Sequence, residues 1–240
     1  MPFVLRPASK CVTLSPPPVM TMPCVACWLP VRAGASAPAT ISRPFSSPTT
    51  KAGRQDSRQI QRIKSGESSL DDLFALEKPT IAAVGGPAVG YGMDIALYCD
   101  IRFASENAKF GWYFVRRGVL GTVGGTFILR QLVGLSKAFE LTLTGDLVDA
   151  DEALRIGLVS RVVPQESLLE EARTMARKLA SGPPLAQRAV KRAMHKGFQM
   201  DWKSLGEYQQ ALGDVLWRTD DHREGVNSFV EKRDPKFTGR

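Results

Sequence analysis

A glycine-rich turn followed by an acidic residue is the first feature that could do chemistry. Residues 85–94 read GGPAVGYGMD, a tight turn that leads into a run with helical character beginning at Tyr91. Asp94 falls on the first turn of this predicted helix, where a partly desolvated carboxylate could act as a general base or acid. Two ordinary alternatives stay open, because an Asp near a helix start is often only a cap and a glycine turn often serves only packing.

The cysteines give a weak metal-binding signal. Cys24 and Cys27 form a CxxC pair, but no second pair follows, and the chain has only two histidines, His195 and His222. A structural zinc site needs four ligands, so a chance spacing explains this pair better than a zinc site does. We therefore expect no metal ion.

The net charge of +8 is concentrated at the start of the chain. Residues 1–64 hold nine Lys and Arg residues against one acid, whereas residues 65–240 hold 23 basic and 23 acidic residues. The main body is neutral, so its composition does not support a basic face for nucleic acid. No run approaches 18 consecutive apolar residues, so we expect no membrane span and a cytoplasmic protein.

The N-terminal segment, residues 1–64, differs from the rest in composition. It holds ten of the 16 prolines, is rich in Ala, Ser and Arg, and shows no sustained helix or strand period. A disordered tail and an organellar transit peptide both have this composition. The two interpretations stay open.

The remainder of the chain alternates strand and helix patterns before it becomes helical. The run Thr80–Val84 is β-branched and apolar, as expected of a buried parallel strand. The further strands are expected at residues 100–104, 108–111 and 158–163, and the helices at 91–99, 149–157, 165–180, 184–218 and 220–232, with Gly85–Gly90 as a loop. The predicted fold class is α/β, with a helical C-terminal region.

Five ordered blocks carry a family resemblance. They read IAAVGGPAVGYGMDIALYCDIRFAS, AKFG, GVLGTVGGT, LTGDLVDADEALRIGLVSRVVP and HREGVNSFVEKRDPKF. In order and spacing they resemble the crotonase superfamily, the enoyl-CoA hydratase/isomerase family, over about residues 77–237. The resemblance implies a crotonase-like ββα spiral core and a C-terminal helical region that packs homotrimers or dimers of trimers. The expected domains are residues 1–64, 65–182 and 183–240.

The resemblance also implies roles for the residues of the glycine turn. The family stabilises a thioester enolate with two backbone N–H groups, one of which falls on Tyr91, between Gly90 and Gly92. Such a donor survives a change of side chain. The first of the two glutamates that hydratases use aligns with Asp94, and the second aligns with Phe114, which cannot transfer a proton.

Neighbouring aromatic residues and two C-terminal residues complete the expected site. Tyr113 is the nearest replacement for the lost proton donor, and an aromatic pocket wall is the alternative. Trp112 and Phe114 suggest a bulky or aromatic acyl group. Phe229 and Lys232 match family positions that contact coenzyme A, with Lys232 as a point charge for phosphate.

The resemblance suggests a third interpretation of the N-terminal segment. Read one nucleotide back, the codons permitted for residues 27–42 allow LAAGAGRGFCAGDDL. This resembles the family segment G-x-G-(R/K)-x-F-(C/S)-A-G-x-D, which supplies the other oxyanion donor. We hypothesise that roughly residues 20–55 are an out-of-frame translation of the family's N-terminal half. Sequencing the gene tests this, and DNA without the alternative frame would exclude it.

The resemblance thus predicts an acyl-CoA enzyme that needs no cofactor, because coenzyme A is part of the substrate. Isomerisation, decarboxylation and thioester hydrolysis are alternatives to hydration, since all four reactions use the same oxyanion hole. A non-catalytic acyl-CoA-binding protein is an alternative of another class, which Phe114 favours. RNA binding through the basic N-terminal segment is the remaining alternative, and we expect neither nucleic acid nor a membrane as partner.

Overall fold

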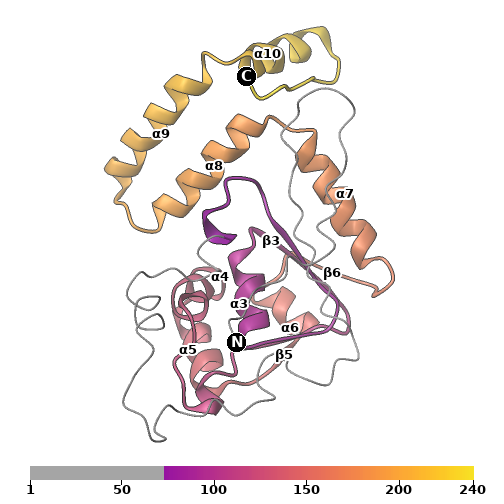
Figure 1. Ribbon diagram of the computed structural model, residues 1–240, viewed down its shortest axis with the longest axis vertical. Helices are drawn as coiled ribbons and strands as arrows, with labels where there is room; N and C mark the ends of the chain where they lie inside the picture. The colour runs from indigo at the N-terminus through magenta and orange to yellow at the C-terminus, as the bar shows by residue number, and fades with distance from the viewer. Residues whose placement is uncertain (1–72) are drawn as a thin grey trace, which may run out of the picture. The chain divides into compact units, whose positions relative to one another are not determined.

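The computed structural model describes residues 73–240, which are drawn in colour in Figure 1. The described residues form two compact units: a core unit with residues 73–75 and Ala83–Leu168, and a helical unit with Leu76–Ala82 and Leu169–Arg240. The predictions for residues 1–64, including the CxxC pair and the out-of-frame hypothesis, lie outside the described residues. The predicted domain boundaries stay predictions, since a compact unit is not by itself an independently folding domain.

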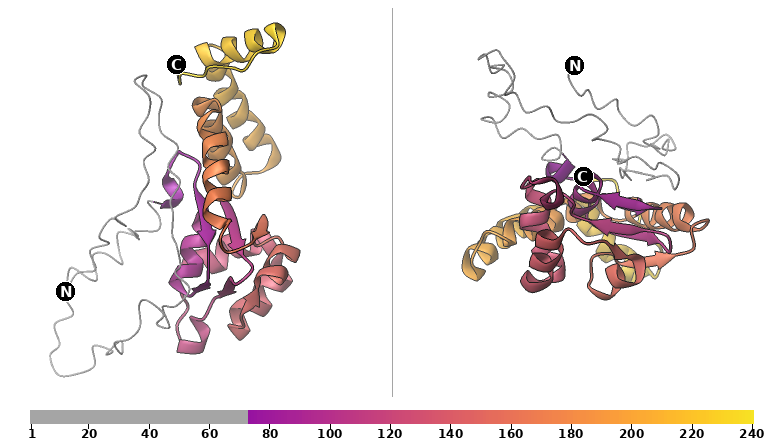
Figure 2. Two further views of the ribbon diagram at one scale, coloured as in Figure 1. Left: turned by 90° about the vertical axis from the view of Figure 1, so that its right-hand side faces the viewer. Right: turned by 90° about the horizontal axis from the view of Figure 1, so that it is seen from below.

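Three strands form the first sheet, in the order β1 (Ile81–Val84), β3 (Ile101–Ser105) and β6 (Arg161–Val163). Strands β3 and β6 are parallel, and Figure 2 shows β1 and β3 side by side. All four residues of β1 are buried, as are the last four of β3. Strands covered on both faces read as continuous apolar runs, which explains why the sequence pattern predicted them.

A second sheet has the order β2 (Pro87–Val89), β4 (Lys109–Gly111) and β5 (Val148–Asp149). Strand β2 lies within the stretch that was predicted as a loop, so that expectation was wrong in part. It runs parallel to β4, with Ala88 opposite Phe110. Three residues between glycines are too short to show a strand period, and β2 exists because β4 supplies its hydrogen bonds.

The core unit also carries the helices α3 (Tyr91–Tyr98), α4 (Leu129–Val133), α5 (Leu135–Thr144) and α6 (Ala150–Arg155). The predicted capping of α6 is confirmed, because Asp149 accepts a hydrogen bond from the Glu152 N–H at 2.9 Å. The strand predicted at 158–163 begins only at Arg161. The N–H groups of Leu158 and Val159 donate instead to the Ala153 carbonyl, which closes α6.

Arg102 anchors the C-terminal end of α3. The side chain is buried and donates to the carbonyls of Cys99 at 2.5 Å and Ala96 at 3.5 Å, and to the Leu158 carbonyl at 2.8 Å. Cations near a helix C-terminus interact favourably with its dipole. Burial lowers the pKa of Arg102. The helix that carries Asp94 is therefore held from its far end by the next strand.

The helical unit consists mainly of α7 (Leu168–Ala180), α8 (Pro184–Gly197), α9 (Trp202–Leu216) and α10 (Asp220–Glu231). Helices α8 and α9 pack side by side (Figure 1). Asp201 caps α9 and Thr219 caps α10 through their side-chain oxygens. None of the helices within residues 73–240 combines the length and apolar character needed to cross a bilayer.

Gly206, in helix α9, lies where the structure also has room for a side chain. A Cβ built on Gly206 would meet no heavy atom within 4 Å, and its φ lies outside the left-handed region. We therefore expect Gly206→Ala to raise the free energy of unfolding by about 0.5–1 kcal/mol, because alanine loses less backbone entropy on folding. Urea denaturation measures this, and an unchanged or lower midpoint would contradict it.

Candidate active site

The start of helix α3 depends on the backbone conformation of Gly90. This residue has φ 56° and ψ −120°, a conformation that residues with a Cβ rarely adopt, and it is the N-cap of α3. Its N–H donates to the Gly111 carbonyl at 2.8 Å, at the end of β4. The glycine thus turns the chain from β2 directly into a helix at the edge of the second sheet.

Tyr91 and Gly92 form the beginning of α3, and both are half-buried. In any α-helix the first N–H groups have no acceptor within the helix itself, and the helix dipole adds positive potential there. A Cβ built on Gly92 would meet no heavy atom within 4 Å, so there is open space beside this first turn. The turn can receive an anionic group of a ligand.

Asp94 lies at the end of this first turn of α3 and has 0% of its surface exposed. Trp112 Nε1 donates to its Oδ1 at 3.1 Å, and the Thr122 hydroxyl donates to its Oδ2 at 2.6 Å. Burial raises the pKa of Asp94 to about 6, although hydrogen bonds from Thr122, Trp112 and the Gly125 backbone oppose the rise. Near neutral pH this carboxyl group can both accept and donate a proton.

Three glycines make room for this arrangement. A Cβ on Gly121 would lie 2.5 Å from the Phe114 ring, one on Gly124 would lie 2.6 Å from Asp94 Oδ1, and one on Gly125 would lie 2.2 Å from the Trp112 indole. Real Cβ atoms do not approach other atoms so closely. The GTVGG segment is therefore glycine-rich because Asp94 and the two aromatic rings press against its backbone.

The aromatic residues after β4 have different surroundings. Trp112 has only 3% of its surface exposed and packs edge-to-face on Phe114, with 5.2 Å between the ring centroids. Phe114 is half-buried. The Tyr113 ring lies under the Arg116 guanidinium at 5.1 Å, and Arg116 pairs with Asp146. Trp112 is thus a hydrogen-bond donor to Asp94, and the role predicted for Tyr113 stays a prediction.

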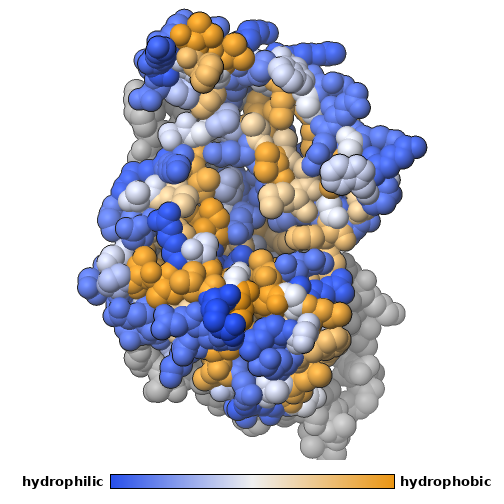
Figure 3. Space-filling model, turned by 180° about the vertical axis from the view of Figure 1, so that it is seen from behind, coloured by the Kyte–Doolittle hydropathy of each residue, from blue (hydrophilic) through white to orange (hydrophobic). Residues whose placement is uncertain are grey.

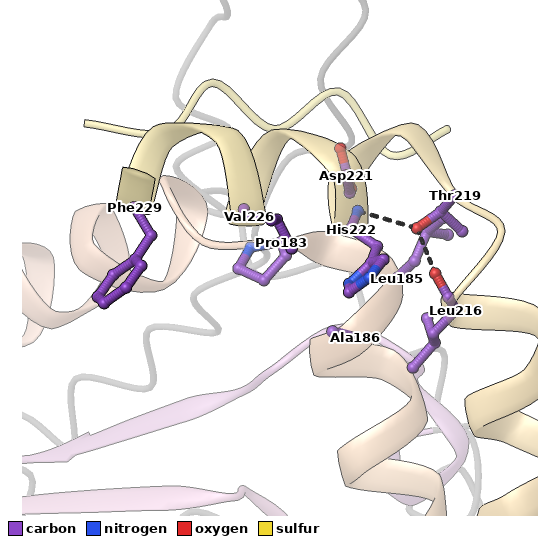
Figure 4. A pocket seen from close by; sticks show the side chains of 10 residues that line it. Pro183, Leu185, Ala186, Leu216, Thr219, Asp221, His222, Val226 and Phe229 are labelled. Atoms are coloured by element: carbon purple, nitrogen blue, oxygen red, sulfur yellow. Dashed lines mark hydrogen bonds between the residues drawn. The ribbon is translucent and has the colours of Figure 1, made fainter. Parts of the chain in front are cut away.

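The two C-terminal residues predicted to contact coenzyme A belong to the helical unit. Phe229, on α10, is 85% exposed and lines an apolar cavity of about 550 Å³ between α8, α9 and α10. Figure 4 shows Phe229 at one end of this cavity and His222 toward the other. Lys232 is exposed and ends α10 with φ 53°. Their predicted roles stay predictions.

Thr122 is the residue of this site that sequence reasoning missed. It stands inside the GVLGTVGGT block, which helps to carry the resemblance, but no role was predicted for it. A threonine in a glycine-rich loop gives no sign of which acid it contacts. The presence of a hydroxyl in this block would have narrowed the choice only to Thr122 and Thr126.

Comparisons with known proteins agree on one family. A family model described as enoyl-CoA hydratase/isomerase matches residues 44–240. A probable enoyl-CoA hydratase of Mycobacterium tuberculosis is 42% identical over 168 residues, which cover 70% of this chain and 65% of the relative. The (E)-benzylidenesuccinyl-CoA hydratase of Thauera aromatica is 44% identical over 177 residues, covering 74% of this chain and 69% of that protein.

Solved structures give the same result. An enoyl-CoA hydratase of Bacillus anthracis aligns with a TM-score of 0.72 at 34% identity. The alignment covers 78% of this chain and 73% of the chain of that hydratase. A structure from Geobacillus kaustophilus aligns with the same TM-score at 36% identity. The predicted fold class, an α/β core followed by C-terminal helices, is confirmed. The chain spans about 65% of the length of the first curated relatives that it matches.

Proposed function

Because the chain belongs to the enoyl-CoA hydratase/isomerase family, we propose that it acts on acyl-CoA thioesters at the N-terminus of α3. The observation that carries the proposal is Asp94, a fully buried carboxylate on the first turn of a helix whose N-cap is a glycine with positive φ. The predicted family resemblance is confirmed, and the match begins earlier in the chain than Glu77.

In the proposed reaction the thioester oxygen lies against the first turn of α3. The Tyr91 backbone N–H donates to this oxygen as it gains negative charge in the enolate-like state. A preorganised backbone donor and the helix dipole stabilise such charge more in the transition state than in the substrate. The Gly90 conformation and the open space beside Gly92 support this placement.

Asp94 is the proposed proton-transfer group. Its raised pKa, about 6, lies close to neutral pH, where a general acid or base is most effective. Hydration of an enoyl-CoA is the favoured reaction, because relatives named as enoyl-CoA hydratases share 42% of the aligned residues with this chain. Isomerisation, decarboxylation and thioester hydrolysis are the alternatives on the same oxyanion site.

The nature of residue 114 favours a bulky acyl group and also a second candidate function. Phe114 is half-buried and supplies an apolar wall where the family places a second carboxylate. A relative named for benzylidenesuccinyl-CoA is 44% identical to this chain, so we propose an aromatic acyl group. The second candidate is a non-catalytic acyl-CoA-binding protein, which the loss of that carboxylate favours.

A panel of thioesters tests the function. It contains crotonyl-CoA, cinnamoyl-CoA, a β,γ-unsaturated acyl-CoA, a saturated acyl-CoA and a malonyl-type thioester, each assayed for turnover and for binding. We expect hydration of an enoyl-CoA, with cinnamoyl-CoA preferred over crotonyl-CoA. Binding without turnover would establish the non-catalytic candidate. If the chain neither binds nor turns over any of these thioesters, the proposal is overturned.

We also propose that the chain assembles as a homotrimer or a dimer of trimers through the helical unit. Apolar side chains reach the surface of α9 and α10, and Figure 3 shows such a group at the top of the view, where α10 lies. Trp202 and Phe229 are the most exposed of them. Light scattering on the purified chain measures the mass, and a monomer would contradict the assembly.

Lys232 provides a test of how coenzyme A is held. We expect Lys232→Ala to raise KM for the thioester about fivefold with little change in kcat, because a phosphate contact made equally in ground and transition states affects only binding. Lys236→Ala is the control, since it removes the same charge from an exposed residue nearby. Equal KM values in both variants would remove Lys232 from the binding site.

A further inference from the structure

We propose that Thr122 relays protons between Asp94 and the reacting atoms, so that one carboxyl group performs both proton transfers of a hydration. The inference rests on the proposed function and adds a catalytic residue to it. It also accounts for how a site could hydrate an enoyl thioester with Phe114 in place of a second carboxylate.

The buried position of Asp94 is the first reason. The residue has 0% of its surface exposed, and each carboxylate oxygen already accepts a hydrogen bond from a side chain. A water molecule or an acyl chain therefore meets no exposed part of this carboxylate. Any proton that Asp94 exchanges with a substrate must pass through a group that touches it.

Among residues 73–240, two side chains donate to Asp94, and of these two only Thr122 can relay a proton. Indole nitrogen is a donor without an acceptor lone pair, so Trp112 cannot take up a proton as it gives one away. A hydroxyl both donates and accepts. Thr122 is half-buried, whereas Trp112 is buried, so the threonine is also the donor that keeps surface toward solvent.

The hydrogen bonds of Thr122 fix the direction of the relay. Its Oγ1 donates to Asp94 Oδ2 at 2.6 Å, a length typical of a hydroxyl bound to a carboxylate, and it accepts from the Gly124 N–H at 3.3 Å. A hydroxyl oxygen has two lone pairs, so one remains for a water molecule. The hydroxyl proton is thus already directed at the base before water arrives.

The Phe114 ring lies between the oxyanion turn and the segment that carries Thr122. Its Cζ atom lies 3.9 Å from a Cβ built on Gly90, and its Cδ2 atom lies 2.5 Å from one built on Gly121, the neighbour of Thr122. A single aromatic ring therefore spans the distance between the N-cap of α3 and the relay segment. In the proposed complex, the width of this ring separates a substrate held at that N-cap from the segment that carries Thr122.

The reaction balances with water as the only co-reactant. Water gives a proton to Thr122 Oγ1 while the Thr122 proton moves to Asp94 Oδ2, and the resulting hydroxide forms a C–O bond at the β-carbon. The π electrons move to the thioester enolate, whose oxygen accepts from the Tyr91 N–H. Asp94 then returns its proton through Thr122 to the α-carbon, which regenerates the carboxylate and completes the addition of water.

The test compares three threonine variants. Thr122→Val removes the hydroxyl at nearly constant volume, Thr122→Ser keeps it, and Thr126→Val is the matched control, because the exposed Thr126 hydroxyl bonds only weakly, to the Val123 carbonyl at 3.5 Å. We expect Thr122→Val to lower kcat for hydration by about a hundredfold or more with KM nearly constant. Thr122→Ser should stay within about fivefold of the wild type, and Thr126→Val should be unchanged.

A second measurement on the unaltered chain keeps the proposal falsifiable if Thr122→Val does not fold. In mixtures of H₂O and D₂O, kcat is plotted against the deuterium fraction of the solvent. Two protons transferred in the rate-limiting step give a curved plot, whereas one proton gives a straight line. A curve supports the relay. A straight line, or a Thr122→Val variant as fast as the wild type, overturns the relay and leaves the proposed function intact. A chain that hydrates no thioester overturns both.

Discussion

Asp94→Asn is expected to lower kcat by about 10²–10⁴-fold, the range typical of a lost general acid–base group. In the unaltered chain kcat should fall as the pH drops below about 6, because protonated Asp94 cannot accept a proton from water. Asparagine has almost the same shape as aspartate. Its amide oxygen can accept from Trp112 and its amide nitrogen can donate to the Thr122 hydroxyl, because a hydroxyl can accept as well as donate. The loss would therefore report chemistry and not misfolding.

The pH profile of kcat distinguishes a lost proton transfer from a smaller fraction of folded enzyme, which would lower kcat equally at every pH. The variant should keep a small residual rate whose acid limb near pH 6 has disappeared. Asp146→Asn is a suitable control, because that carboxylate is exposed and pairs with Arg116. If Asp94→Asn retained its rate and its pH profile, Asp94 would have no part in the mechanism.

The same substitution should stabilise the fold at neutral pH. The pKa of Asp94 rises from 3.8 to about 6 on folding, so the folded chain binds more protons than the unfolded chain between these values. This contribution to stability is complete below about pH 3.8 and is lost as the pH rises to about 6. At about 1.4 kcal/mol per pH unit, the ionised group costs on the order of 3 kcal/mol at pH 7.

Urea denaturation at pH 4.5 and pH 7.5 measures this contribution. The difference in unfolding free energy between Asp94→Asn and the unaltered chain should favour the variant at the higher pH and shrink at the lower pH. A variant that is less stable at pH 7.5 would show that ionised Asp94 supports the fold. The expected result would mean that a buried, reactive carboxyl group at this site lowers the unfolding free energy of the unaltered chain at neutral pH.

Gly125→Ala is expected to destabilise the core unit by about 3 kcal/mol, near the upper end for overpacking a buried site. The new Cβ would lie 2.2 Å from Trp112 Cε2 and 2.3 Å from its Nε1. Trp112 is buried, so it cannot swing into solvent, and moving it breaks its bond to Asp94. Both stability and activity should fall, as measured by urea denaturation and thioester turnover.

A rescue experiment ties this effect to one contact. Combining Gly125→Ala with Trp112→Phe removes the indole atoms that the Cβ would strike, so part of the lost stability should return relative to the single glycine variant. Gly206→Ala is the control for a glycine in open space. A Gly125→Ala variant that loses less than about 1 kcal/mol would show that Trp112 can move at little cost.

Patterns along the chain were sufficient for most elements of residues 73–240. The apolar run of β1, the helix from Tyr91 and the capping of α6 by Asp149 each follow from a few adjacent residues, and each is present. Strand β2 was missed because only its pairing with β4 reveals it. The strand at 158–163 was predicted too long because the hydrogen bonds of Leu158 and Val159 close a helix instead.

Local sequence also determined the family and the position of one carboxylate, because ordered blocks and the first turn of a helix are properties of the linear chain. What that carboxylate touches was decided only by the tertiary structure. Trp112 and Thr122 lie 18 and 28 residues from Asp94 in sequence. They reach it because the glycines at 121, 124 and 125 leave room for the side chains of Phe114, Asp94 and Trp112 against their backbone. Such contacts depend on packing between distant segments, which no local pattern encodes.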